Sequence, residues 1–103
     1  MQNKLFSKAI LSLIISLLPN FVSADEAAIK AGEQKSMVCT ACHGIENSNN
    51  PEWPNLSQQS KKYLIGQLHA FRGGVRNNAL TSSQAMGLSD QDIIDIASYY
   101  NSI

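Results

Sequence analysis

The chain has 103 residues and two cysteines, which is room for one domain at most. Its formal net charge is zero, and without Lys4 and Lys8 of the leader described next it becomes −2, because six basic residues then face eight acidic ones. Such mild acidity argues against nucleic acid as a partner and against binding to an anionic membrane surface.

The first residues are typical of a secretory signal peptide. Two lysines precede an apolar run over residues 9–18, and small residues follow at a point that allows cleavage after Ala24. An uncleaved anchor is the alternative, but ten residues are too few to span a bilayer, which needs about 20. We expect a signal peptide over residues 1–24, a periplasmic location and no stable membrane insertion after cleavage.

Removal of 24 residues from 103 leaves a domain of 79 over residues 25–103. A chain of that size buries little apolar surface and usually needs a disulfide, a metal or a large cofactor. The sequence predicts three helices in it, joined by polar loops and without a convincing strand. They cover residues 25–38, residues 59–71 and the segment from Ser89 nearly to Ile103.

The ends of these helices carry recognisable signals. Ser89 is expected to cap the last helix together with Asp92, as a capping box with Asp in place of Glu. Gly73 and Gly74 are expected to stop the middle helix. Gly32 lowers the helix propensity of the first one, so it marks either a close helix crossing or a tolerated surface position.

The chemistry lies in the motif Cys39-Thr40-Ala41-Cys42-His43, the attachment signature of c-type haem. Residues three apart project from one side of a helical turn, so both thiols can add to the vinyl groups of one haem. His43 then lies under the iron as the proximal ligand. Attachment needs reduced thiols and haem outside the cytoplasm, which agrees with export.

Three other interpretations of the cysteines are weaker. A structural disulfide suits an oxidising compartment but leaves His43 without a role. A thioredoxin-like redox pair would need a strand before the helix. A zinc site would need four ligands, and Cys39, Cys42, His43 and His69 are the only candidates, with adjacent Cys42 and His43 poorly placed for a tetrahedron.

From Gly32 to Tyr100 the chain resembles the small class I cytochromes c. It is most similar to single domains of bacterial di-haem cytochromes and to the cytochrome subunits of sulfide-oxidising flavocytochromes. The resemblance implies a compact all-α fold, with three main helices and loops around one covalent haem c, and the terminal helices crossing near Gly32 and Tyr99. It rests on Cys42-His43-Gly44, Pro54-Asn55-Leu56, Tyr63-Leu64, Gln67-Leu68, Phe71-Arg72, Leu88-Ser89-Asp90, Ala97 and Tyr99-Tyr100.

The resemblance also implies roles for residues around the haem. The carbonyl of Pro54, eleven residues past His43, is expected to accept a hydrogen bond from the ring of the proximal histidine, which fixes that ring. Trp53 is expected either to cover a haem edge or propionate or to pack generically. Arg72 and Arg76 either pair with propionates or remain solvated.

The second axial ligand is where the match to the family fails. In the related cytochromes a methionine stands about eight residues before the serine that caps the last helix, and here that residue is Thr81. Met86 is the candidate that remains, since Met37 is tied near the proximal side. Three outcomes stay open: ligation by Met86 with a rearranged loop over residues 76–85, an open or water-bound iron, or ligation by His69.

These residues predict an electron carrier rather than an enzyme. It would cycle between Fe(III) and Fe(II), with a quinol-oxidising complex, a terminal oxidase or a flavoprotein dehydrogenase as redox partners. One alternative is the haem subunit of a periplasmic dehydrogenase such as a sulfide-oxidising flavocytochrome. Another is a ligand-binding haem protein with an open iron, which the threonine at position 81 keeps under consideration.

Overall fold

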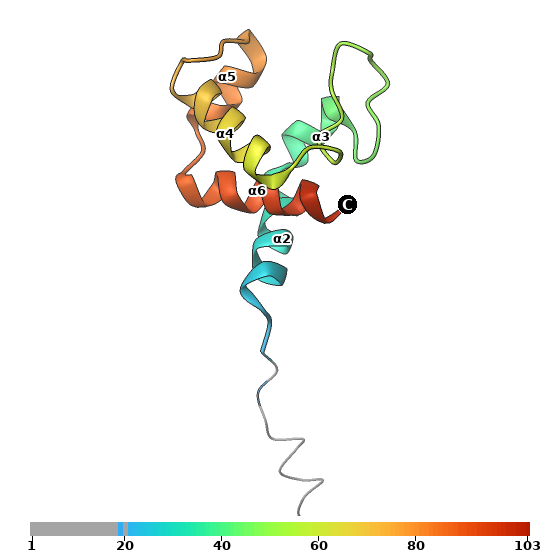
Figure 1. Cartoon of the computed structure of the whole chain (residues 1–103), viewed down its shortest axis with the longest axis vertical. Coiled ribbons are helices and arrows are strands. Elements are labelled where there is room, and N and C mark those ends of the chain that lie inside the picture. The colour runs from blue at the N-terminus through green and yellow to red at the C-terminus, as the bar shows by residue number, and fades with distance from the viewer. Residues whose placement is uncertain (1–18, 20) are drawn as a thin grey trace, which may run out of the picture.

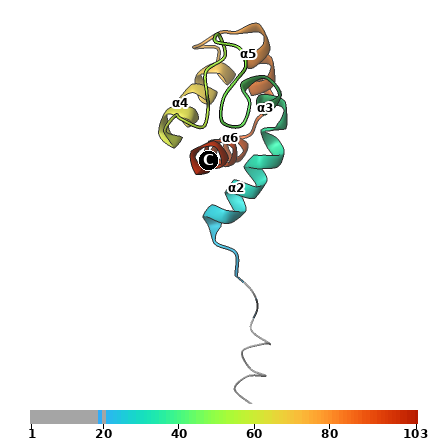
Figure 2. The same ribbon diagram turned by 90° about the vertical axis from the view of Figure 1, so that its right-hand side faces the viewer.

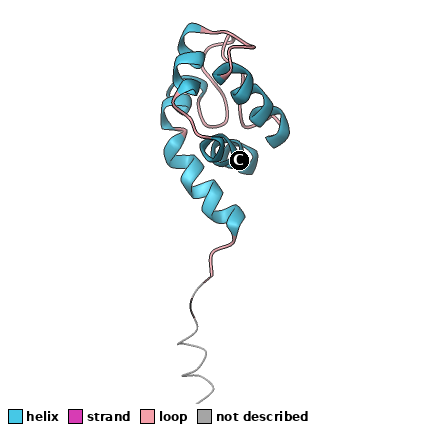
Figure 3. Ribbon diagram, turned by 90° about the vertical axis from the view of Figure 1, so that its left-hand side faces the viewer, coloured by secondary structure: helices cyan, strands magenta, loops and turns pink. Residues whose placement is uncertain are grey.

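The computed structural model describes residue 19 and residues 21–103; the predicted signal peptide over residues 1–24 lies almost entirely outside these residues. The described part contains helices and loops and no strand (Figure 3). No helix in this part is long and apolar enough to cross a membrane. The helices are α2 (Ala24–Lys35), α3 (Met37–His43), α4 (Lys61–Arg72), α5 (Ala79–Met86) and α6 (Asp90–Ser102).

The centre of the fold is the crossing of α2 and α6, the first and last described helices (Figure 1). Gly32 lies in it, fully covered, and a Cβ added there would overlap the carbonyl oxygen of Asp95 and lie 2.9 Å from the Cβ of Tyr99. The absence of a side chain therefore allows the two backbones to approach. The close crossing is the correct choice of the two expected for Gly32.

An ion-pair cluster holds the same crossing. Nζ of Lys35, at the end of α2, lies 2.8 Å from Oδ1 of Asp92 and 2.6 Å from Oδ2 of Asp95 on α6. The hydrogen bonds that Lys35 donates to these two carboxylates raise its pKa. Burial raises the pKa of Asp95, but the hydrogen bonds from Lys35 and Gln91 outweigh it, and the net pKa lies below its usual value.

The start of α6 agrees with the prediction. The Ser89 hydroxyl accepts a bond from the backbone N–H of Asp92 at 3.0 Å, and the Asp92 carboxylate accepts one from the Ser89 N–H at 2.9 Å. This reciprocal cap satisfies two N–H groups that would otherwise lack partners. From there α6 runs through the core, where Ile93, Ala97 and Tyr100 are wholly buried.

The core cluster joins α6 to α4. Leu64 packs with Ile96, Ala97 and Tyr100, and half-buried apolar side chains surround them. The view nearly along α6 shows α4 on one side of it and α2 with α3 on the other (Figure 2). As predicted, α4 stops at a glycine pair, with Gly74 at a φ of +79° that other residues rarely adopt.

Two predicted boundaries are wrong. The sequence predicts one helix over residues 25–38, but α2 ends at Lys35, and the motif lies on its own seven-residue helix, α3. Ser36 forms the junction: it is completely buried, and its hydroxyl donates to the carbonyl of Glu33 at 3.1 Å. Hydrogen bonds between the two helices continue through Ser36, from its N–H to Gly32 and from Thr40 to its carbonyl, so the axis bends without unravelling.

The second correction concerns residues 76–83, predicted as a loop. The structure forms α5 from Ala79 onward, because the Asn78 side chain accepts bonds from the backbone N–H groups of Leu80 and Thr81, each at 3.1 Å. Gly87 ends the helix. An asparagine followed by Ala-Leu and closed by glycine is a capped helix pattern, and that signal was available in the sequence.

Candidate functional site

The two cysteines of the motif lie one turn apart on α3, as their spacing predicts. Both are free thiols. Cys39 packs against the core, and burial raises the pKa of its thiol, whereas Cys42 is exposed. Both line a cavity of about 320 Å³, so the sulfurs are available to a group that occupies it.

His43 ends α3 and is oriented by the following loop. Its Nδ1 lies 2.7 Å from the carbonyl oxygen of Pro54. A carbonyl can only accept, so Nδ1 carries the proton and the neutral ring keeps its lone pair on Nε2. His43 also lines the cavity. The ring thus has the tautomer that a metal ligand of this kind needs.

The loop that presents Pro54 is held by its own polar side chains. The Ser48 hydroxyl lies 2.6 Å from the carbonyl of Asn50 and 2.5 Å from that of Trp53. The Asn55 side chain accepts from the N–H of Ser48 at 3.0 Å. The loop leaves α3 through Gly44, whose φ of +71° and contact with Asn47 leave no room for a side chain. These bonds fix the Pro54 carbonyl opposite the imidazole.

Tyr100, on α6, links α3 to the core. Its ring is fully buried, and its hydroxyl lies 2.8 Å from that of Thr40 and donates to the carbonyl of Ser36 at 3.4 Å. Burial raises the pKa of this phenol. Thr40 lies between the two cysteines, so this bond helps set the rotation of α3. Sequence reasoning missed it, because two residues 60 apart give no local signal of pairing.

The rest of the cavity wall is mainly apolar. Trp53, expected either to cover a haem edge or propionate or to pack generically, lines it and is 39% exposed. Besides the residues already named, the lining comes from α3, the loop that follows it, α4 and the segment after it, α5 and α6: Val38, Glu52, Leu56, Gln59, Tyr63, Leu64, Gln67, Leu68, Phe71, Arg76, Asn78, Leu80, Thr81, Gln84 and Ile96.

The wall contributed by α5 differs from the expected one. Leu80, Thr81 and Gln84 line the cavity, but Met86 does not, and its side chain is 72% exposed. The structure therefore does not bring Met86 together with His43. His69 is also exposed and outside the lining, with its Nδ1 2.9 Å from Nη2 of Arg72.

The two arginines have different surroundings. Arg72 pairs with Asp90, with 2.5 Å between Nη2 and Oδ1, and this hydrogen bond lowers the pKa of that carboxyl. Arg76 lines the cavity, where its guanidinium lies 4.6 Å above the ring of Phe71 and donates to Gln67. Of the two arginines, only Arg76 lines the cavity.

A haem fits this arrangement better than the alternatives. Two free thiols, one imidazole with Nε2 available and an apolar lining meet at one cavity. The described helices and loops contain no strand to support a thioredoxin-like pair. Within residues 19 and 21–103, no three His, Cys, Asp or Glu side chains gather to hold a metal ion, as a zinc site would require.

Comparison with known proteins agrees with this chemistry. The sequence model of the family described as cytochrome c matches residues 29–103. Cytochrome c-554(548) of Halomonas halodenitrificans is 49% identical over 76 residues, which cover 70% of this chain and 92% of that protein. Cytochrome c4 of Pseudomonas aeruginosa is 40% identical over 98% of this chain, but this chain spans only 49% of its length. The thiosulfate dehydrogenase electron acceptor of Thiomonas intermedia is 33% identical, over 88% of this chain and 43% of that protein.

Proposed function

Because this chain belongs to the cytochrome c family, we propose that it is a periplasmic carrier of single electrons whose haem is bound by Cys39, Cys42 and His43. Membership of the family means that it carries covalent haem c and that its activity is electron transfer. The haem supplies the Fe(III)/Fe(II) couple, and the polypeptide binds it, orients it and limits the access of water.

The observation that carries the residue assignment is the 2.7 Å contact between Nδ1 of His43 and the carbonyl of Pro54. It leaves Nε2 of the imidazole available to bind the haem iron and raises the basicity of that nitrogen. Cys39 and Cys42 form the two thioether links. Trp53 covers part of the haem, and Arg76 is placed to neutralise a propionate.

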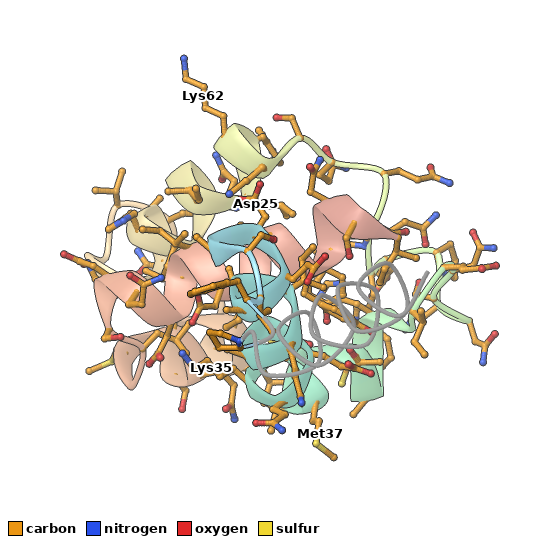
Figure 4. All side chains as sticks on the ribbon, turned by 90° about the horizontal axis from the view of Figure 1, so that it is seen from below. Asp25, Lys35, Met37 and Lys62 are labelled. Atoms are coloured by element: carbon orange, nitrogen blue, oxygen red, sulfur yellow. The ribbon has the colours of Figure 1, made fainter. Side chains whose placement is uncertain are left out.

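Partners would dock where the cavity opens to solvent. Cys42, Trp53 and Leu80 are all exposed at its rim, and Leu80 is 73% exposed. A small apolar rim suits the limited, short-lived interfaces of redox pairs. Lys61 and Lys62 add positive charge at the start of α4, and Lys62 projects away from the body (Figure 4).

The names of relatives point to the kind of partner. One is the electron acceptor of a thiosulfate dehydrogenase, and the cytochrome subunit of a sulfide dehydrogenase from Chlorobaculum tepidum is 28% identical over 72 residues. We propose that this chain receives electrons from a periplasmic dehydrogenase or quinol-oxidising complex and passes them to a terminal oxidase. A permanent place as the subunit of such a dehydrogenase is the alternative.

The test is to produce the exported chain in a host that attaches haem c. We expect a mature protein that begins after Ala24, retains its haem in denaturant and titrates with one electron per chain. The control is Cys42→Ser, which should lose one thioether and yield the haem spectrum of a single-cysteine attachment. Release of all haem from the wild type by denaturant would reject the assignment. A stable complex with a co-purifying dehydrogenase would favour the subunit role over the free carrier.

A further inference from the structure

The wall formed by α5 faces the cavity with residues that are not iron ligands. Leu80, Thr81 and Gln84 lie about one turn apart at most and line it. Haem iron is usually held by His, Met, Cys or Tyr side chains, and an aliphatic chain, a hydroxyl and an amide are not among them.

Met86 cannot replace them without dismantling this helix. At 3.6 residues per turn, it lies about 140° around the α5 axis from Thr81, about 160° from Gln84 and about 120° from Leu80. Rotating the helix so that Met86 faces the cavity would move Ala85, which is only 1% exposed, out of its buried position.

The other methionine and the other histidine of the described residues are directed elsewhere. Met37 is 71% exposed and projects away from the body (Figure 4). His69 is exposed and lies against Arg72. Neither residue lines the cavity.

The polar groups of the α5 wall are free to act on something else. In the described part of the chain, the hydroxyl of Thr81 and the side-chain amide of Gln84 make no hydrogen bond with another residue. Thr81 is half-buried, which limits competition from bulk water. A hydroxyl and an amide on the wall of a mainly apolar cavity suit a small, weakly polar molecule that accepts a hydrogen bond.

We propose that the α5 wall forms a binding site for a small neutral diatomic molecule such as carbon monoxide or nitric oxide, and that neither this wall nor any histidine or methionine of the described residues supplies a second iron ligand besides His43. The Thr81 hydroxyl and the Gln84 amide donate hydrogen bonds to the bound molecule, and Leu80 covers it. This inference rests on the proposed attachment through Cys39 and Cys42 with His43 as ligand.

The experiment compares matured wild type with two methionine variants, by absorption spectra in both oxidation states and by carbon monoxide titration of the reduced proteins. Wild type and Met86→Leu should both be high-spin and bind carbon monoxide alike. Thr81→Met places a thioether on the wall that faces the cavity. It should give a low-spin spectrum with the far-red iron–sulfur band and at least about tenfold weaker carbon monoxide binding.

A second variant tests the hydrogen bond. Thr81→Val keeps the shape and removes the hydroxyl, so carbon monoxide should dissociate about fivefold faster, as expected for the loss of one hydrogen bond. The proposal is overturned if wild type is low-spin and does not bind carbon monoxide. This holds both if Met86→Leu then becomes high-spin, which would identify Met86 as the ligand, and if it stays low-spin, which would mean that another side chain is the ligand. Absence of covalent haem from the wild type would instead refute the proposed function, so the two failures are distinguishable.

Discussion

The two walls of the cavity are built in different ways. The α3 wall is held by contacts that converge on it: Tyr100 bonds Thr40, and the loop through Ser48 and Asn55 fixes the Pro54 carbonyl on His43. The α5 wall is held locally, by the Asn78 cap, by the Ser82 hydroxyl that accepts from the Asn78 N–H, and by the buried Ala85. The α3 wall, which must hold His43 in one orientation, is thus fixed by several independent contacts. The α5 wall has fewer such contacts, so its residues can change without loss of the fold.

The largest expected effect comes from removing the attachment on the α3 wall. Cys39→Ser combined with Cys42→Ser should abolish covalent haem almost entirely, because no thiol remains. A domain this small depends on its cofactor for much of its stability, so we also expect a pronounced loss of helical circular dichroism. Ser83→Ala, on the exposed face of α5, is the control and should keep full haem content. Covalent haem in the double variant would contradict the assignment.

The next effect is at the crossing that carries α3. Gly32→Ala should lower the free energy of unfolding by about 3 kcal/mol, because the added methyl overlaps the Asp95 carbonyl and neither backbone can move aside cheaply. Chemical denaturation of the holoprotein measures it.

The matched control for Gly32→Ala is Gly66→Ala on α4, where an added Cβ meets nothing within 4 Å. That substitution should stabilise the protein by up to about 1 kcal/mol, as helix propensity predicts. Equal effects at the two glycines would mean that the α2–α6 crossing is looser than described.

A smaller effect is expected in the loop that orients His43. Ser48→Ala removes a hydroxyl bonded within the loop to the carbonyls of Asn50 and Trp53, and should cost about 1 kcal/mol of unfolding free energy. Because that loop also positions the Pro54 carbonyl, the reduction potential should shift as well. Ser57→Ala, whose single bond to Glu46 is long at 3.4 Å, is the control. An unchanged potential in both variants would show that Pro54 is held without Ser48.

The contrast between the walls also explains which features the sequence predicted. The spacing of Cys39, Cys42 and His43 and the capping box at Ser89 are local patterns with one structural solution, and the Pro54 contact followed from the family resemblance. The bend at Ser36 and the partnership of Thr40 with Tyr100 depend on tertiary packing, which no short segment encodes. Helix α5 was missed because its polar Thr-Ser-Ser-Gln run was interpreted as a loop, although Asn78 and Gly87 mark its ends.

The direction of Met86 illustrates the same limit. Sequence spacing showed that Thr81 stands where related cytochromes have methionine, but it could not tell whether the intervening residues unwind to deliver Met86. The capped helix answers the geometric question by placing the two residues on different faces. The chemical identity of the ligand stays a prediction, tested by the Thr81→Met and Met86→Leu pair.

The smallest expected effect is the pH dependence of the α2–α6 crossing. The pKa values of Asp92 and Asp95 lie below the usual 3.8, through hydrogen bonds from Lys35 in both cases and, for Asp95, against the effect of burial. Depressed folded-state values mean that these carboxylates contribute stability fully above about pH 4 and lose it as the pH falls through their folded pKa values. The raised pKa of Lys35 likewise means a contribution that is lost only as the pH rises beyond 10.5. Between these limits Asp95→Asn should lower the unfolding free energy. Below about pH 3 the plot of unfolding free energy against pH for this variant should approach that of the wild type. Parallel plots across the acid range would show that Asp95 titrates alike in the folded and unfolded chain.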